Sequence, residues 1–274
     1  MTPTLVRGSR TGADTRARDW AEIQERMLVP LYEAVYDRLE VGPGTCLLGL
    51  GCGSGLALLM ASARGAAVTG CDPDERRLAL ARERLLPEPR WGAPARHEAR
   101  IELLCGGPER TADRAGAPFT MVTALDPASP CDELLPDLTE AARLTEHGSP
   151  VVLAGWGPSE RCATSRVLCV AARLAEPRGH AVRSRLSGRD DLEEVARDAG
   201  LRPDGSGRVA CPFGYPDMDS AVRGLISTGL FDPAVEATDQ PQVEKELAEA
   251  LHPYRRADGT VRMENVFRYV VARV

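Results

Sequence analysis

Lysine is nearly absent from this sequence: Lys245 is the only one among 34 basic residues, and the others are arginine. The formal net charge is −6, which argues against a strongly basic nucleic-acid binder. The preference for arginine, together with abundant alanine, glycine and proline, is typical of a GC-rich genome rather than of a particular function. Nucleic acid is therefore not an expected partner.

Long apolar runs are absent as well. No stretch approaches the roughly 20 apolar residues that a membrane-spanning helix needs, so no membrane span is expected. The N-terminus carries Arg7 and Arg10 without a following apolar segment, which argues against a secretory signal. We therefore expect a disordered leader over residues 1–16 and a cytoplasmic protein whose eight cysteines are thiols.

Several motifs for other chemistries are missing. No CxxC pair occurs and the four histidines are scattered, which argues against a structural zinc site. The chain has neither the GxSxG turn of α/β-hydrolases nor the GxxxxGK[ST] loop of phosphate-binding NTPases. Asp126, Asp132 and Glu133 have no spacing typical of a metal site, so no metal is expected.

A regular alternation of apolar segments is present. Over residues 18–39, apolar side chains recur at three- and four-residue steps, which predicts one amphipathic helix. Further helices are expected over 56–63, 73–86, 131–144, 163–174 and 191–199. Strands are expected over 45–50, 66–71, 101–105, 119–125 and 150–155. This alternation predicts a parallel, doubly wound α/β sheet.

The C-terminal part breaks this alternation. A sixth strand is expected over 208–213 and a final strand over 266–274, with helices over 217–228 and 242–251 between them. That connection is too long for an ordinary loop. We therefore expect an α/β domain of residues 17–213 and 261–274, with residues 214–260 inserted as a helical cap over the site.

A glycine-rich turn joins the first expected strand to the helix that follows it. Gly51, Gly53 and Gly55 fit the pattern GxGxG, whereas the dinucleotide fingerprint GxGxxG fits in no register. Glycines allow positive φ and close approach of a ligand, and the helix N-terminus offers free N–H groups. In an open α/β sheet, ligands bind beyond the carboxyl ends of the strands, where this turn lies.

Asp72 stands at the end of the second expected strand. A carboxylate at that position can accept both hydroxyl protons of a ribose. Asp72 followed by Pro73 also fits a helix N-cap with proline at the first helical position. Next to the glycine turn, the ligand-binding interpretation is favoured over the cap.

Together these features resemble the class I S-adenosylmethionine-dependent methyltransferases, in particular the small-molecule type similar to quinone-biosynthesis enzymes. The resemblance covers roughly residues 20–274, and LGCGSG (50–55) and VTGCDP (68–73) are its most specific stretches. It implies a seven-stranded, Rossmann-like sheet whose last strand is antiparallel, preceded by an N-terminal helix.

The resemblance also implies that the cofactor is S-adenosylmethionine. The glycine turn would lie along its methionine part, Asp72 would hold the ribose, Pro73 would pack on the adenine and Leu125 would flank the transferred group. Two glycines after the third strand, Gly106 and Gly107, would lie along the edge of the adenine. The implied cofactor-binding residues are Gly51, Cys52, Gly53, Gly55, Asp72, Pro73, Gly106, Gly107 and Leu125.

Two positions depart from the family pattern. Gly49 stands where the family usually has an acid that helps to hold the amino group of the methionine part. Gly107 stands where an aspartate often accepts from the adenine amine. Losing such polar contacts costs about 1 kcal/mol or more each.

The substrate pocket is predicted from the few aromatic residues, which make up 4% of the chain. Those expected at the ligand edge of the sheet or on the first helix could form an apolar wall for a flat substrate: Trp20, Tyr32, Trp156, Phe213 and Tyr215. For Tyr32, ordinary helix packing is an equally good interpretation. Asp126 is the candidate general base, and a turn-initiating Asp before Pro127 is its alternative.

These observations predict methyl transfer to an O, N or C nucleophile of a small, partly aromatic metabolite, in bacterial secondary metabolism by analogy. The partner is a small-molecule substrate, and a homodimer stays open. One alternative is a relative that keeps the fold without methylating, as a cyclase-type catalyst or a ligand-binding partner protein. A nicotinamide oxidoreductase is a weaker alternative, because its glycine spacing does not fit.

Overall fold

The structure is a computed structural model. It describes residues 12–86, 100–111, 118–129, 131–175, 188 and 190–274. Of the expected leader, residues 1–11 lie outside this range. None of the helices in the described part is long and apolar enough to cross a membrane.

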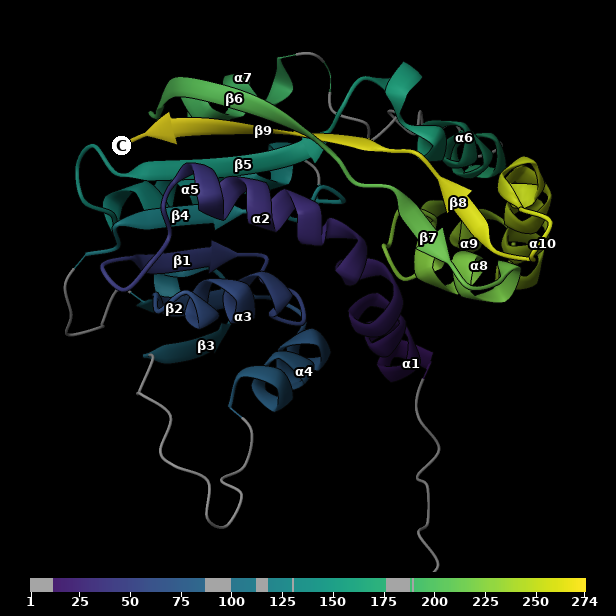
Figure 1. Cartoon of the computed structure of the whole chain (residues 1–274), viewed down its shortest axis with the longest axis horizontal. Helices are drawn as coiled ribbons and strands as arrows, with labels where there is room; N and C mark the ends of the chain where they lie inside the picture. The colour runs from purple at the N-terminus through teal and green to yellow at the C-terminus, as the bar shows by residue number, and fades with distance from the viewer. Residues whose placement is uncertain (1–11, 87–99, 112–117, 130, 176–187, 189) are drawn as a thin grey trace, which may run out of the picture.

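A seven-stranded sheet forms the centre of the fold (Figure 1). Its strands follow the order β3-β2-β1-β4-β5-β9-β6. The first five are parallel, and β9 runs antiparallel to β5 and β6, which confirms the expected antiparallel last strand. The strands are β1 (Cys46–Leu50), β2 (Ala67–Asp72), β3 (Ile101–Cys105), β4 (Met121–Ala124), β5 (Pro150–Trp156), β6 (Arg202–Ala210) and β9 (Val266–Arg273).

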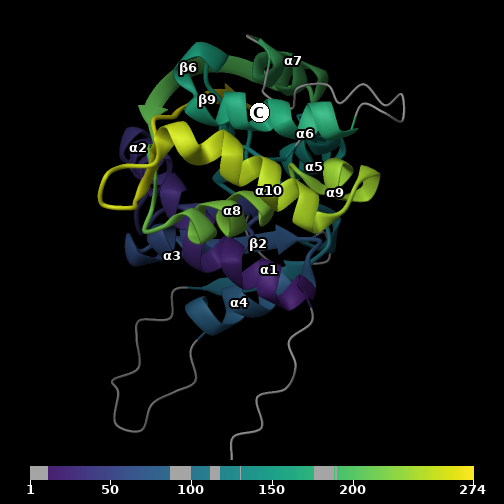
Figure 2. The ribbon, with the colours of Figure 1, turned by 90° about the vertical axis from the view of Figure 1, so that its right-hand side faces the viewer.

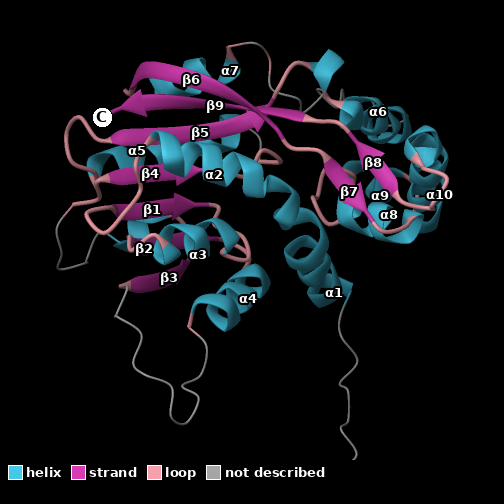
Figure 3. Ribbon diagram, in the orientation of Figure 1, coloured by secondary structure: helices cyan, strands magenta, loops and turns pink. Residues whose placement is uncertain are grey.

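Helices cover both faces of the sheet (Figure 3). On one face, side chains of α2 (Val29–Arg38), α3 (Leu56–Ala63) and α4 (Glu75–Leu85) share a core with Leu47 of β1. On the other face, α5 (Leu135–Arg143) and α7 (Asp191–Asp198) pack with Leu48. Successive residues of a strand point to opposite faces of the sheet. When helices cover both faces, the side chains on each face must therefore be apolar. This explains the continuous apolar runs of the central strands.

The N-terminal helix is not continuous. Instead of one helix over 18–39, the chain forms α1 (Gly12–Asp19), a π-helical turn (Trp20–Gln24), a 3₁₀ turn (Glu25–Leu28) and then α2. The helix also begins at Gly12, within the segment expected to be a disordered leader. Apolar periodicity therefore identified the helical segment but not its interruption.

The edge strand β6 begins six residues before the expected strand over 208–213. Its first part, RPDGSG (202–207), is polar and has a composition typical of turns, yet it pairs with β9. Burial alternates along this strand, as expected when one face is solvated. The pairing partner, and not the local composition, makes this segment a strand.

A mainly helical region lies beyond the ends of β5, β6 and β9 (Figure 1), and its helices face the viewer in Figure 2. It contains α6 (Ala163–Ala175), α8 (Met218–Ile226), α9 (Asp232–Ala237) and α10 (Gln240–Leu251). Two short strands absent from the sequence prediction, β7 (Phe213–Tyr215) and β8 (Val261–Met263), form a separate antiparallel pair. Short 3₁₀ turns complete the described elements: Pro108–Thr111, Cys131–Leu134, Ser159–Arg161 and His252–Tyr254.

Candidate functional site

The glycine turn lies between β1 and α3, at the carboxyl end of the central strand. Gly51, Gly53 and Gly55 have φ of +57°, +57° and +78°, a conformation that side-chain-bearing residues rarely adopt. A Cβ at Gly55 would lie 3.0 Å from Ala81 of α4, so this glycine allows close helix packing. A Cβ at Gly51 would meet nothing within 4 Å, so the backbone here faces open space.

Asp72 ends β2, the strand beside β1, and is only 4% exposed. Its Oδ2 accepts the backbone N–H of Gly53 at 2.8 Å, and its Oδ1 accepts that of Asp74 at 2.8 Å. Burial raises the pKa of Asp72, while these two hydrogen bonds act to lower it. The helix N-cap is instead Asp74, whose carboxylate accepts from Arg76 N at 2.9 Å. Asp72 therefore holds the glycine turn and does not cap α4.

A pocket opens beside the turn and collects residues from five segments. It brings together seven of the residues predicted from the sequence: Trp20, Tyr32, Gly51, Cys52, Gly53, Leu125 and Asp126. The other lining residues are Glu25, Gly49, Leu50, Ala57, Leu58 and Thr123. Burial raises the pKa of Tyr32 well above its ordinary value, and the carboxylates of Glu25 and Asp126 raise it further. Tyr32 is therefore a neutral hydroxyl facing this site.

Asp126 follows β4 and lies at the pocket beside a cation that the sequence analysis did not single out. Arg77 of α4 places a guanidinium nitrogen 3.7 Å from Asp126 Oδ2. The same guanidinium lies 4.6 Å from the ring centre of Trp20 and donates to the carbonyl of Ser227 at 3.4 Å. Burial raises the pKa of Asp126, and Arg77 acts to lower it. Asp126 also accepts from Ala128 N at 2.9 Å, the contact of a turn-initiating aspartate.

Replacing Arg77 by leucine is expected to destabilise the fold by about 1–3 kcal/mol at neutral pH, because Asp126 loses its cation in a largely buried position. Without the guanidinium, the pKa of Asp126 in the folded state rises further above its unfolded value. A carboxyl whose pKa is higher in the folded than in the unfolded state lowers the free energy of unfolding as the pH rises from the unfolded-state pKa to the folded-state pKa. Urea titrations should therefore show a smaller loss near pH 4.5 than near pH 7.

The control for this experiment is the double variant Arg77→Leu/Asp126→Asn, in which no carboxyl can titrate at this position. Its difference from the wild type should not depend on pH in that interval. A loss of stability in Arg77→Leu that is the same at both pH values would contradict the assigned pairing.

Three of the predicted substrate residues lie elsewhere. Trp156, Phe213 and Tyr215 are 3%, 1% and 1% exposed and pack in one aromatic cluster with Phe267. They are not among the described residues that line the pocket. Tyr215 donates to Gln24 Oε1 at 2.9 Å, which ties this cluster to the N-terminal segment. Their role as a substrate wall stays a prediction.

The loop after β3 lies on the other side of Asp72. Gly106 has φ of +115° and donates its N–H to the carbonyl of Asp72 at 3.1 Å. Gly107 donates its N–H to Glu109 Oε1 at 3.2 Å, so a carboxylate from two residues along stands beside the glycine. Pro73 is exposed and precedes α4. The adenine contacts assigned to these residues stay predictions.

Sequence reasoning missed Glu25 and Arg77. Glu25 lies inside an amphipathic helical segment, where a single acid is normally solvent-facing. In the structure it is 2% exposed. Arg77 was one of several arginines on α4, and only the tertiary fold shows which of them reaches the pocket.

In the part of the chain that the structure describes, no group of three or more His, Cys, Asp or Glu side chains could hold a metal ion.

The comparisons with known proteins agree with this geometry. Residues 48–153 match the family model described as a methyltransferase domain, and no curated protein matches the sequence. Among solved structures, BH2331 of Bacillus halodurans C-125 is 14% identical with a TM-score of 0.55, covering 88% of this chain and 97% of that one.

Two further solved structures are similar at 16% identity. A methyltransferase from Geobacter sulfurreducens in complex with S-adenosyl-L-homocysteine has a TM-score of 0.51, covering 96% of this chain and 98% of that one. The [4+2]-cyclase SpnF has a TM-score of 0.50, covering 89% and 80%. Residues 48–153 thus match a methyltransferase domain, and the chain as a whole shares its Rossmann-like fold with these solved structures.

Proposed function

We propose that this protein transfers a methyl group from S-adenosylmethionine to an O, N or C nucleophile of a small, partly aromatic metabolite. The observation that carries the proposal is the glycine turn fixed by Asp72 at the carboxyl end of β1. The residues fit the cofactor in two respects: the backbone at Gly51 faces open space, and the buried Trp20 Nε1–H has no partner among the described residues.

The cofactor, when bound, supplies an electrophilic methyl group on a sulfonium sulfur. The protein's contribution is then mainly positioning and exclusion of water. Asp72 would orient the ribose, and Leu125, which is 5% exposed, would flank the methyl group without a competing nucleophile. Trp20 and Tyr32 line the same pocket and would supply part of an apolar wall for the substrate.

Asp126 is the group that could accept a proton from the attacking substrate atom. Its carboxylate lies at the pocket, and burial raises its pKa above the ordinary value, which is the direction that favours a general base. The nearby guanidinium of Arg77 acts against that shift. The proposal therefore assigns Asp126 to substrates whose nucleophile carries an acidic proton, such as a phenol.

The alternative is a relative that binds the cofactor without transferring methyl. Gly49 and Gly107 at positions that are usually acidic favour it. The similarity to the [4+2]-cyclase SpnF supports it at the level of the fold. In that case the pocket would hold a reactive substrate conformer, and no S-adenosylhomocysteine would form during turnover.

The first test is titration calorimetry with S-adenosylmethionine and, separately, with S-adenosylhomocysteine, after mass spectrometry for copurified cofactor. We expect micromolar binding of both. A folded, cofactor-free sample that binds neither would contradict the proposal. If both bind, S-adenosylhomocysteine release with a panel of phenols and amines distinguishes methyl transfer from the alternative.

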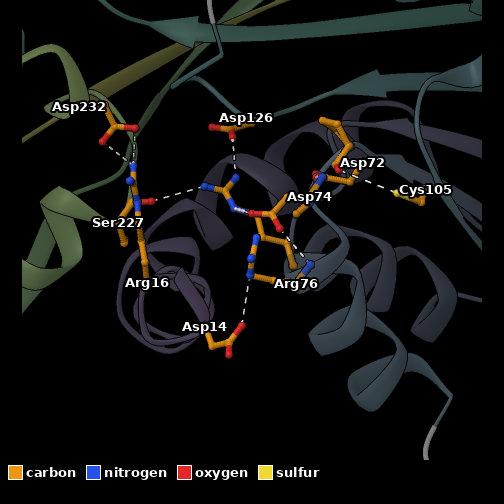
Figure 4. A network of polar contacts seen from close by, with 12 residues as sticks. Asp14, Arg16, Asp72, Asp74, Arg76, Cys105, Asp126, Ser227 and Asp232 are labelled. Carbon is orange, nitrogen blue, oxygen red and sulfur yellow. Dashed lines mark hydrogen bonds and ion pairs between the residues drawn. The ribbon is translucent and has the colours of Figure 1, made fainter. Parts of the chain in front are cut away.

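The wider setting is proposed by analogy. We propose a cytoplasmic enzyme of bacterial natural product biosynthesis, with residues 214–260 as a cap over the substrate. Ion pairs support the cap: Arg16 lies 2.7 Å from Asp232 of α9, and Asp19 pairs with Arg223 of α8. These contacts tie the helices after β7 to the N-terminal segment that lines the pocket, and Figure 4 shows the pair of Arg16 and Asp232.

A further inference from the structure

The break in the N-terminal helix places two side chains on the glycine turn. The backbone N–H of Glu25 donates to the carbonyl of Trp20, a bond to the fifth residue back. In an α-helix, residues five apart lie about 140° apart around the axis. The wider π-helical turn returns Glu25 toward the face of Trp20. A Cβ at Gly53 would lie 3.1 Å from Trp20 Nε1 and 3.4 Å from Glu25 Oε1, so both polar atoms face the turn.

Trp20 has an unused donor at this position. The residue is 3% exposed, and its Nε1–H has no hydrogen-bond partner among the described residues. Tryptophan can only donate, so the N–H requires an acceptor. The guanidinium of Arg77, 4.6 Å from the centre of the ring, packs against it. A buried N–H fixed in this way, in the wall of a pocket, is suited to an acceptor on a ligand.

Glu25 has an acceptor oxygen to spare. Its Oε2 accepts from the hydroxyl of Ser54 and lies 2.7 Å from Arg84. Its Oε1 accepts a longer bond, 3.3 Å, from Leu56 N. A carboxylate oxygen has room for a further donor, and Arg84 offsets the cost of burying the charge. Glu25 thus presents a fixed carboxylate in the pocket that Gly49 also lines.

We infer that Trp20 and Glu25 bind the amino-acid end of S-adenosylmethionine. Glu25 Oε1 accepts from the α-ammonium, and Trp20 Nε1–H donates to the α-carboxylate. An ammonium is only a donor and a carboxylate only an acceptor, so the two side chains complement the two charges. Glu25, from the N-terminal segment, thereby replaces the acid that the strand lacks at Gly49. This inference rests on the proposed function.

The test compares two ligands that differ in the amino-acid end. S-adenosylhomocysteine has it, whereas 5′-methylthioadenosine keeps the nucleoside and the thioether without it. Calorimetric affinities are measured for the wild type, Glu25→Gln, Trp20→Phe and the control Glu22→Gln, whose side chain lies in the same segment and is 69% exposed. Glu25→Gln is expected to weaken S-adenosylhomocysteine about tenfold or more and methylthioadenosine less than about twofold.

Trp20→Phe keeps the ring and removes only the donor, so it should weaken S-adenosylhomocysteine about threefold to tenfold with the same selectivity. This variant tests the inference independently if Glu25→Gln folds poorly. Glu22→Gln should change neither affinity. Equal losses for both ligands in Glu25→Gln and Trp20→Phe would show a structural role and overturn the inference. A wild type that binds neither ligand would overturn the proposed function itself.

Discussion

Replacing Asp72 by alanine is expected to weaken binding of S-adenosylhomocysteine about tenfold to hundredfold. The carboxylate is 4% exposed and fixes the Gly53 N–H, so its loss removes the proposed ribose contact and also loosens the turn. Each hydrogen bond to a charged group is worth about 1.5–3 kcal/mol, and about 1.4 kcal/mol corresponds to tenfold in affinity. Titration calorimetry measures the change directly.

The matched control is Asp74→Ala, two residues along the same loop. Asp74 caps α4 and its side chain is 41% exposed, so this change should cost about 1 kcal/mol of stability. It should leave cofactor affinity within about twofold, because the proposed contact with ribose is made by Asp72. An Asp72→Ala variant that binds as tightly as the wild type would remove the ribose assignment.

Replacing Gly51 by alanine is expected to weaken cofactor binding at least about tenfold while the protein stays folded. The residue has φ of +57°, and an L side chain in that conformation costs about 1–2 kcal/mol. A Cβ there would meet no protein atom within 4 Å. The methyl group would instead occupy the space proposed for the cofactor. Affinity should therefore fall by more than the modest loss of stability suggests.

Alanine variants of two other glycines serve as controls for this experiment. Gly44 has open space around a Cβ and no left-handed φ, so Gly44→Ala should change neither stability nor affinity appreciably. Gly148 has φ of +81° with nothing within 4 Å, and Gly148→Ala should lose stability without losing affinity. Thermal melts and calorimetry of the three variants separate backbone strain from blocked binding. A Gly51→Ala variant with wild-type affinity would show that the cofactor does not pass this glycine.

The alternation of helices and strands was predictable because buried parallel strands and amphipathic helices have different periods of apolar residues. The glycine turn and Asp72 were predictable for a related reason. Both belong to one local unit of strand, turn and helix, in which the conformation depends on residues close in sequence. The strand β3 was predicted with its observed bounds, Ile101–Cys105, as was the helix α3, Leu56–Ala63.

The rest depended on contacts between distant segments. RPDGSG became the start of β6 only through pairing with β9, whose residues lie more than 60 positions away. Arg77 reaches Asp126 across 49 positions because α4 and the end of β4 border the same pocket. No local pattern encodes such partners.

The sequence by itself determined the class of the fold, the glycine turn and the acid beside it. The tertiary structure decided how the pocket is completed. It turned Trp20 and Glu25 onto the turn through a π-helical break and gave Glu25 its partners Ser54 and Arg84. The physical reason is burial. A single acid in a helix can be buried away from water only where a cation and a hydroxyl from elsewhere in the chain contact it, and only the tertiary structure brings these partners together.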